Sequence, residues 1–234
     1  EKDGTFANTE RRVQRVRKAV EPPGEARADW WILQELATRF GYPLSYESPR
    51  EIQEEIRKVA PSYGGITYER LEGEGLAWPC PTLEHPGTRF LHQGRFTRGK
   101  GLFHAIEYRE PAEMPDADFP LMLTTGRFHM HYHTGTMTRH SPSLEKEGPE
   151  QVAEIHPRDA EALGLKEGDL ARISSRRGEI LTKVNLTDRI TPGLVFLSFH
   201  YQESNANKLT NTAYDPIAKI PELKVCAVKV EKAA

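Results

Sequence analysis

The sequence predicts a protein that is mainly β in its second half, where we expect a small β-barrel preceded by helices and a long connector. Three observations support this fold class. Short apolar stretches of strand length recur after residue 118, separated by turn residues. Two segments before residue 60 have the apolar spacing of helices. Residues 61–117, which lie between these regions, are rich in proline and glycine.

The composition is that of a globular protein, with 234 residues, 37% hydrophobic and 28% charged residues, and a net charge of −2. Such a small charge gives no general attraction to nucleic acid or to an anionic membrane, and no apolar run reaches membrane-spanning length. We expect no nucleic-acid binding, no membrane insertion and a cytoplasmic location. Because the chain begins without methionine, we also expect it to be a piece of a longer protein. Cys80 and Cys226 stand far apart, so neither a disulfide framework nor a zinc site is predicted.

Three helices are predicted before residue 60. The first, Thr9–Ala19, carries mainly basic charge and is ended by a Pro-Pro-Gly sequence. The second, Asp29–Phe40, begins with an aspartate that can cap it and ends before Gly41. The third has Pro49 at its first position and runs to about Val59. The apolar residues expected to be buried are Trp31, Leu33, Leu36, Ala37 and Phe40 in the second helix and Ile52, Ile56 and Val59 in the third.

Residues 61–117 are predicted to form an extended connector, because a stretch of this length is too long for a simple loop in a compact domain. We expect it to lie across another surface of the protein. The aromatic side chains expected to anchor it are Trp78, Phe90, Phe96 and Phe103.

The remaining sequence, 118–234, is predicted to be rich in strands. The strand candidates are Phe119–Leu123, Leu170–Ser174, Glu179–Val184, Leu194–Ser198 and Val225–Val230. One short helix, Pro157–Leu163, is expected to stop at Gly164. The sequence Arg176-Arg177-Gly178 reads as a basic hairpin turn. Short strands at this spacing with one helix among them favour a small barrel.

The first of these strands is followed by an unusually polar stretch. In Thr125-Gly126-Arg127, the glycine allows the backbone to approach a ligand closely. Backbone N–H groups of a tight turn can hold an anion, and the arginine adds a charged fork for phosphate. Three histidines then follow at alternate positions, which would share one side of an extended chain: His129, His131 and His133.

Three interpretations of these histidines remain open. They can bind a transition metal, although no carboxylate or cysteine stands nearby in the sequence to complete a site. They can be the polar edge of a strand. They can also bind a ligand by ring stacking, with help from backbone amides and from the hydroxyl groups that follow.

A second polar cluster lies at residues 204–211, which include three asparagines. An asparagine amide offers both a donor and an acceptor, which matches the edge of a pterin or guanine ring. Phe199, His200 and Tyr201 precede the cluster and can supply a stacking face. The alternative is a plain Asx-capped loop. No catalytic triad, phosphate-binding loop or paired-carboxylate motif is recognisable, so the residues alone predict a barrel that binds a polar ligand.

Several of these motifs, in this order, resemble the C-terminal end of molybdopterin-dependent oxidoreductases, and most closely their molybdopterin dinucleotide-binding domain. The similar stretches are FPLMLTTGR with HTGTMTR, AEIHPRDAEALGLKEGDLARISSRRGEI, and NKLTNTAYDPIAKIPELKVCAVKVEK. The connector, with LAWPCPTLEHPGTRFLHQGRFTRGKGLF, resembles formate dehydrogenase catalytic subunits more than nitrate reductases.

This resemblance implies a domain organisation. Residues 118–234 would form a six-stranded double-psi β-barrel that binds the dinucleotide. Residues 1–60 would be the helical tail of an upstream α/β domain, and 61–117 the connector. The implied cofactor is bis(molybdopterin guanine dinucleotide) with molybdenum or tungsten. The implied cofactor-binding residues are Thr125, Gly126, Arg127, Phe128, His129, His131, His133, Thr134, Phe199, Asn207 and Lys224.

The resemblance also implies a reaction, the oxidation of formate to carbon dioxide with transfer of two electrons. The family's metal-ligating cysteine or selenocysteine, its 4Fe-4S cysteines and its catalytic histidine and arginine lie upstream of the matching region. We therefore expect no catalytic or metal-ligating residue in this chain and no activity in isolation. The expected partners are upstream domains of the same subunit and electron-transfer subunits. Three alternatives stay open: a nitrate reductase or another enzyme of the family, a stand-alone module without cofactor, and a histidine-based metal-binding protein.

Overall fold

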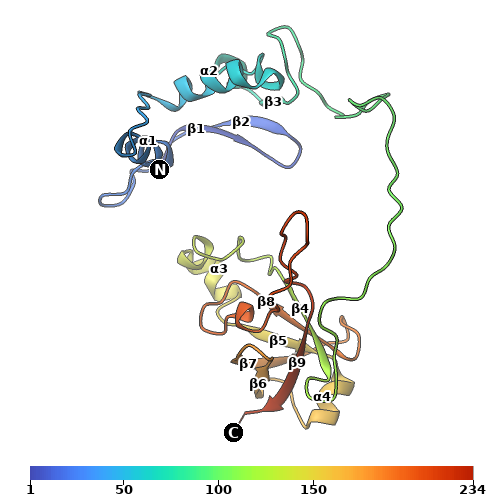
Figure 1. Cartoon of the computed structure of the whole chain (residues 1–234). Coiled ribbons are helices and arrows are strands. Elements are labelled where there is room, and N and C mark those ends of the chain that lie inside the picture. The colour runs from blue at the N-terminus through green and yellow to red at the C-terminus, as the bar shows by residue number, and fades with distance from the viewer. Residues whose placement is uncertain (234) are drawn as a thin grey trace. The chain divides into compact units, whose positions relative to one another are not determined.

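The structure, a computed structural model, describes residues 1–233 and divides the chain into two compact units, Glu1–His104 and Ala105–Ala234. Figure 1 shows both units and the chain segment that joins them. No helix among the described residues is long and apolar enough to cross a membrane. Each unit has its own hydrophobic core, so each is described by itself.

The first unit is a small antiparallel sheet with two helices. Its elements are β1 (Gly4–Ala7), β2 (Arg12–Val16), α1 (Asp29–Arg39), α2 (Pro49–Val59) and β3 (Leu76–Ala77), with short 3-10 turns at Pro61–Tyr63 and Glu69–Leu71. The strand order is β1-β2-β3. Four fully buried residues form its core: Val13, Ile66, Leu71 and Cys80.

The predicted helix Thr9–Ala19 is wrong, because this segment forms β2 at the centre of the sheet. Asn8 makes a tight turn, in which its side-chain oxygen accepts from the N–H of Arg12 at 3.0 Å. Beyond the turn, Val13 is buried and its neighbours face outward, which is the period of a strand. Of the basic side chains that indicated a helical face, Arg17 is exposed, whereas Arg15 shares the side of Val13 and lies 4.0 Å from the ring centre of Tyr68.

The other two helices form within a residue or two of their predicted bounds. The predicted buried face of α1 is wrong, and that of α2 is right only in part, since Ile52 and Ile56 are half-buried. Ala28, not Asp29, occupies the N-cap position of α1, and no residue of α1 is buried. In α2 the buried residue is Gln53, whose amide donates to the carbonyl of Ile66 at 3.0 Å. Val59 is exposed.

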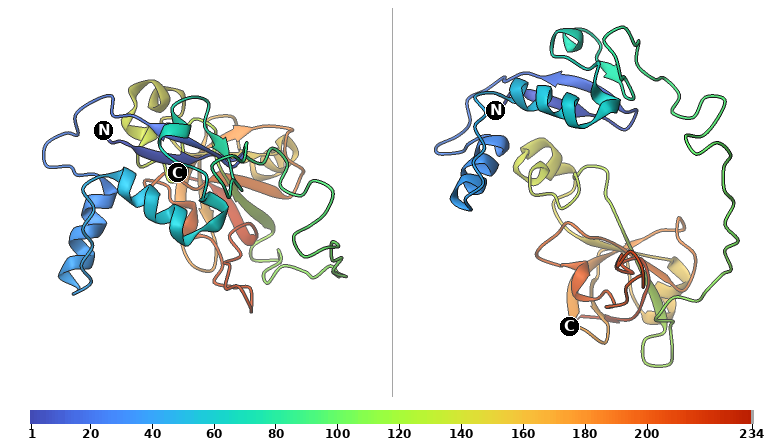
Figure 2. Two further views of the ribbon diagram at one scale, coloured as in Figure 1. Left: turned by 90° about the horizontal axis from the view of Figure 1, so that it is seen from above. Right: turned by 45° about the horizontal axis from the view of Figure 1, so that its top comes forward.

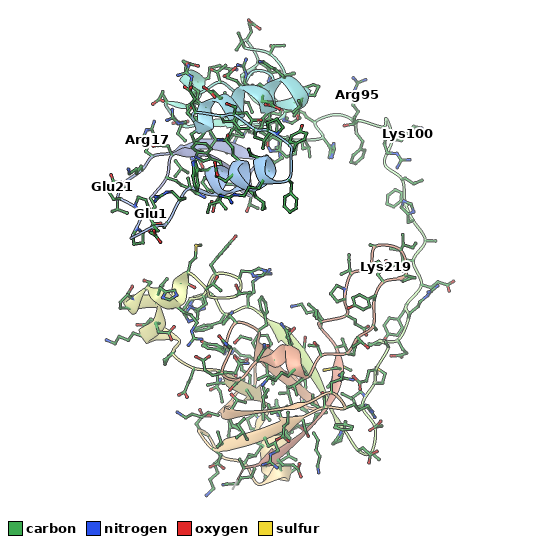
Figure 3. All side chains as sticks on the ribbon, turned by 60° about the vertical axis from the view of Figure 1, so that its left-hand side comes forward. Glu1, Arg17, Glu21, Arg95, Lys100 and Lys219 are labelled. Atoms are coloured by element: carbon green, nitrogen blue, oxygen red, sulfur yellow. The ribbon has the colours of Figure 1, made fainter. Side chains whose placement is uncertain are left out.

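The first part of the predicted connector is folded. Arg70 donates hydrogen bonds to the carbonyl oxygens of Gly65 at 2.6 Å and His85 at 2.7 Å. Its guanidinium thus links two parts of the backbone in this proline-rich stretch. Trp78 is partly buried and stacks on Tyr63. The expected anchors Phe90, Phe96 and Phe103 are instead exposed. In Figure 3 the labelled side chains of Arg95 and Lys100 stand out from an extended stretch of chain.

The second unit is a closed barrel of six strands. The strands are β4 (Leu121–Gly126), β5 (Val152–Ile155), β6 (Leu170–Ser174), β7 (Glu179–Leu186), β8 (Leu194–Ser198) and β9 (Cys226–Lys232). Their order around the barrel is β4-β8-β5-β7-β6-β9. The pairs β4–β8 and β5–β7 are parallel and the others antiparallel. This closed order confirms the predicted fold class, a six-stranded double-psi barrel. Figure 2 shows the chain in two further views.

The barrel core is built from every second residue of its strands, as in Leu121 and Leu123 of β4. Helices α3 (Pro142–Glu147) and α4 (Pro157–Leu163) lie in the connections, with 3-10 turns at Thr138–His140 and Ala206–Lys208. The predicted bounds of α4 are confirmed, and Gly164 ends it in the left-handed conformation with φ +65°. The sequence did not predict β5, a strand of only four residues.

Candidate functional site

The site lies where two parallel neighbouring strands end. In the register of this pair, Thr125 of β4 lies beside Leu197 and Gly126 beside Ser198 of β8. Because the strands run in the same direction, the loops that follow them leave the barrel at the same end. We call residues 127–141 the first loop and residues 199–211 the second loop. Ligand pockets commonly form between such loops.

Three predicted residues secure the strand ends. Thr125 is 5% exposed, and its hydroxyl donates to the carbonyl of Leu223 at 2.7 Å. Lys224 donates from Nζ to the carbonyl of Thr125 at 2.6 Å. Gly126 is the last residue of β4 and not part of a turn. A Cβ on this glycine would lie 2.5 Å from the ring of Phe196, so glycine is needed here to make room for that ring.

The three histidines of the first loop do not share one face, so that prediction is wrong. β4 ends at Gly126, and the chain then turns rather than continuing as a strand. His131 is 3% exposed, whereas His129 and His133 are exposed. His133 adopts the left-handed conformation with φ +53°. Within residues 1–233, no group of three His, Cys, Asp or Glu side chains is placed to hold a metal ion.

His131 ties the first loop to the chain after α3. Its Nε2 lies 2.9 Å from the carbonyl oxygen of Gly148, so Nε2 carries the proton and donates. Its Nδ1 lies 3.2 Å from the hydroxyl of Thr138. Tyr201, from the second loop, donates to the same Gly148 carbonyl at 2.8 Å. A side chain at Gly148 would collide with the ring of Phe128, so all these residues belong to one packed cluster.

His200 links the two loops directly. Its Nδ1 donates to the carbonyl of His133 at 3.1 Å. Burial lowers the pKa of His200, because a charged imidazole would lose its hydration. Its Nε2 is buried and has no hydrogen-bond partner among the described residues. The neighbouring ring of Phe199 lies 5.6 Å from the ring centre of His133 and 5.6 Å from the guanidinium of Arg127.

The two loops and Glu145 of α3 line an open cavity of about 620 Å³. It is lined by Thr134, Gly135, Thr136, Arg139, His140, Glu145, Phe199, His200, Tyr201, Gln202, Asn205 and Asn207. A second cavity, of about 490 Å³, is lined by Arg127, Phe128, His129, Met130, His131, Tyr132, His133, Thr138 and Leu144. Hydroxyl, amide and aromatic groups therefore converge in the first cavity, and histidines and an arginine in the second.

Most of the predicted site residues come together at these cavities. Thr134, Phe199 and Asn207 line the first cavity. Five others line the second: Arg127, Phe128, His129, His131 and His133. The asparagine cluster is partly the Asx-capped loop that was the alternative, since Asn205 accepts from the N–H of Asn207 at 2.9 Å. The side chain of Asn207 remains exposed at the cavity.

Sequence reasoning missed one prominent residue of the first cavity, Arg139. Its guanidinium donates to Glu145 at 3.0 Å and to Glu203 at 2.9 Å, and lies 5.1 Å from the ring centre of Tyr201. The hydrogen bonds from Arg139 hold the pKa values of both carboxyls below their usual range. The only signal in the sequence was that Arg139 ends the HTGTMTR motif. Its partner Glu203 lies 64 residues away, so no local pattern indicates the contact.

Comparison with known proteins gives the family. A model described as the molybdopterin dinucleotide binding domain matches residues 121–227, which span most of the barrel and the second loop. A model described as molybdopterin oxidoreductase matches residues 1–39.

Individual relatives match nearly the whole chain. The alpha subunit of F420-dependent formate dehydrogenase from Methanocaldococcus jannaschii is 54% identical over 99% of this chain and 35% of its own length. A nitrate reductase from Symbiobacterium thermophilum is 43% identical over 100% of this chain and 34% of its own. The chain thus spans about a third of the length of these relatives.

Among solved structures, acetylene hydratase from Pelobacter acetylenicus has the same fold, with a TM-score of 0.68 at 18% identity, covering 100% of this chain and 37% of the hydratase. On the strength of the two family models and of relatives at this level of identity, the chain belongs to the molybdopterin oxidoreductase family and contains its dinucleotide-binding domain.

Proposed function

We propose that this chain forms one wall of the bis(molybdopterin guanine dinucleotide) site in a formate dehydrogenase-like oxidoreductase. One observation carries the proposal most directly. The loops after β4 and β8 meet around a cavity of about 620 Å³, within the region that matches the dinucleotide-binding domain. A polar heterocycle with phosphates needs a site of this kind, with few but well-placed polar groups and an aromatic surface.

The donor set fits such a group. Asn207 has an exposed amide that can pair with a ring edge, and Phe199 offers a ring for stacking. Arg127 is exposed and available to a phosphate. Lys224 uses one ammonium hydrogen on the carbonyl of Thr125 and keeps two others. The buried Nε2 of His200 still requires a donor.

Each of these residues has a different proposed role in binding. Arg127 and Lys224 offset phosphate charge, Phe199 supports the ring, and Asn207 selects its edge. When bound, the metal centre of this cofactor supplies two-electron chemistry, in which formate yields carbon dioxide, a proton and two electrons. We expect the isolated chain to turn over no formate, because we assign its residues to binding and orientation only.

Formate is the proposed substrate because the formate dehydrogenase relative is more similar than the nitrate reductase, at 54% against 43% identity. The proposed partners are the rest of the same subunit and electron-transfer subunits. Assays of the full-length protein with a redox dye would separate the two activities. Formate-dependent dye reduction supports the proposal, whereas nitrate-dependent dye oxidation without formate turnover refutes this choice of substrate.

Binding is tested by titrating the 234-residue chain with guanosine diphosphate while following backbone amide signals. We expect shifts at Thr134, Phe199 and Asn207, and weaker shifts with adenosine diphosphate. Asn207→Ala should weaken binding, whereas Asn185→Ala, in β7, should not. At millimolar nucleotide even a binding free energy of about −4 kcal/mol is visible, so an absence of shifts would contradict a preformed half-site.

A further inference from the structure

Arg139 occupies the centre of the contacts between the first and second loops. The backbone N–H of Arg139 donates to the carbonyl of Gly135 at 2.9 Å, within the first loop. Its guanidinium reaches Glu203, which follows the second loop's Tyr201 by two residues. The same guanidinium also binds Glu145 of α3. Three separate segments that line the first cavity therefore meet at one side chain.

The aliphatic part of the Arg139 side chain is packed as closely as its guanidinium. A Cβ on Gly135 would lie 3.1 Å from Cγ and 3.2 Å from Cδ of Arg139, and 3.5 Å from Cβ of His200. Gly135 itself has φ +73°, which glycine adopts without strain. The first loop thus passes directly over the arginine stem, while Tyr201 packs beneath the guanidinium at 5.1 Å.

The local charge argues that Arg139 does not itself bind phosphate. One guanidinium faces two carboxylates, those of Glu145 and Glu203, so this side of the cavity carries a net charge of about −1. The pKa values of both carboxyls are lowered by their hydrogen bonds to Arg139, so both are ionised at neutral pH. An incoming phosphate would have to displace them.

We infer that Arg139 is a positioning residue, which fixes the separation of the two loops and so holds Phe199 and Asn207 opposite Thr134. The positioning itself follows from the structure, and its effect on nucleotide affinity rests on the proposed function. Loss of the clasp formed by Arg139, Glu145 and Glu203 should loosen both loops and leave the barrel strands unchanged.

The test compares Arg139→Gln, Arg139→Lys and Glu203→Gln in the 234-residue chain. The matched control pair is Arg189→Gln and Glu154→Gln, which removes an exposed Arg–Glu bridge of 3.0 Å elsewhere on the barrel. Hydrogen exchange of backbone amides in the two loops and in β6 and β7 is the first measurement. The second is the dissociation constant for guanosine diphosphate.

In Arg139→Gln we expect hydrogen exchange in the two loops to be about fivefold faster and the affinity for guanosine diphosphate to be about fivefold weaker. Changes of about this size are expected when a partly exposed ion pair is lost. Exchange in β6 and β7 should not change. Arg139→Lys keeps the charge but loses the planar fork, so it should lie between wild type and Arg139→Gln. Neither control variant should change the loops.

Glu203→Gln distinguishes positioning from direct phosphate binding. Positioning predicts weaker nucleotide binding, because the clasp is broken. Direct phosphate binding predicts tighter binding, because the guanidinium is freed, and that result would overturn the inference. Loop exchange that is the same in wild type, Arg139→Gln and Glu203→Gln would also overturn it. Faster loop exchange in a protein that binds no nucleotide would support the clasp and contradict a preformed half-site instead.

Discussion

Replacing Gly126 by alanine tests whether this glycine is present for packing. Gly126 is a strand residue, and its backbone is one that alanine can adopt, so the cost comes from space alone. The new Cβ would lie 2.5 and 2.8 Å from two carbons of the Phe196 ring. Since carbon atoms pack at about 3.5–4.0 Å, the ring must move by about 1 Å. Overpacking of this kind costs about 1–3 kcal/mol.

The measurement is urea unfolding of wild type, Gly126→Ala, Phe196→Leu and the double variant, followed by circular dichroism. All three tryptophans, Trp30, Trp31 and Trp78, lie in the first unit, so tryptophan fluorescence reports that unit separately and serves as the internal control. The double variant should be more stable than the sum of the single changes predicts, by about 1 kcal/mol or more. Strict additivity, or a loss below about 0.5 kcal/mol in Gly126→Ala, would refute the steric explanation.

Three further predictions concern buried or bonded groups of the barrel unit. The pKa of His200 is lower in the folded protein than in the unfolded chain, so the unfolded chain binds a proton at higher pH. The free energy of unfolding should therefore fall as pH drops below about 6.5, by at most about 1.4 kcal/mol per pH unit. In His200→Gln, the free energy of unfolding measured between about pH 6.5 and 4.5 should depend less on pH. Burial raises the pKa of Cys226 to about 11, so iodoacetamide at pH 8 should modify it only after unfolding, as mass spectrometry can check. Lys224→Met removes the hydrogen bond to the carbonyl of Thr125 and should cost about 1 kcal/mol in urea unfolding; an unchanged midpoint would mean that this contact contributes nothing.

The barrel was predictable because its strands carry a local signal. In β6 and β7 every second residue is buried, and this alternation is visible in the sequence. β5 escaped prediction because Val152–Ile155 is too short to show a period. The error at Thr9–Ala19 has a similar origin, since β2 has only five residues and one fully buried residue, Val13, so its alternation was too short to outweigh the charges that suggested a helical face.

The site was predictable as a set of residues but not as an arrangement. Its polar residues stand out in two short stretches, and eight of the eleven residues that the family resemblance named line one of the two cavities. The prediction that the histidines share one side was wrong because β4 ends at Gly126, and the chain that carries them turns instead of continuing as a strand. The pairing of Arg139 with Glu203 joins residues 64 apart, and no local pattern encodes such a contact.

The parallel pairing of β4 with β8 has a consequence for how the protein is made. The two walls of the cavity are separated by about seventy residues of chain, and the ring of strands closes only when β9, Cys226–Lys232, pairs with both β4 and β6. Contacts between such distant segments form slowly, on the order of milliseconds to seconds. During synthesis the first loop therefore leaves the ribosome well before its opposite wall exists. A ligand that contacts both loops can therefore be held between them only after β8 and the second loop have been made.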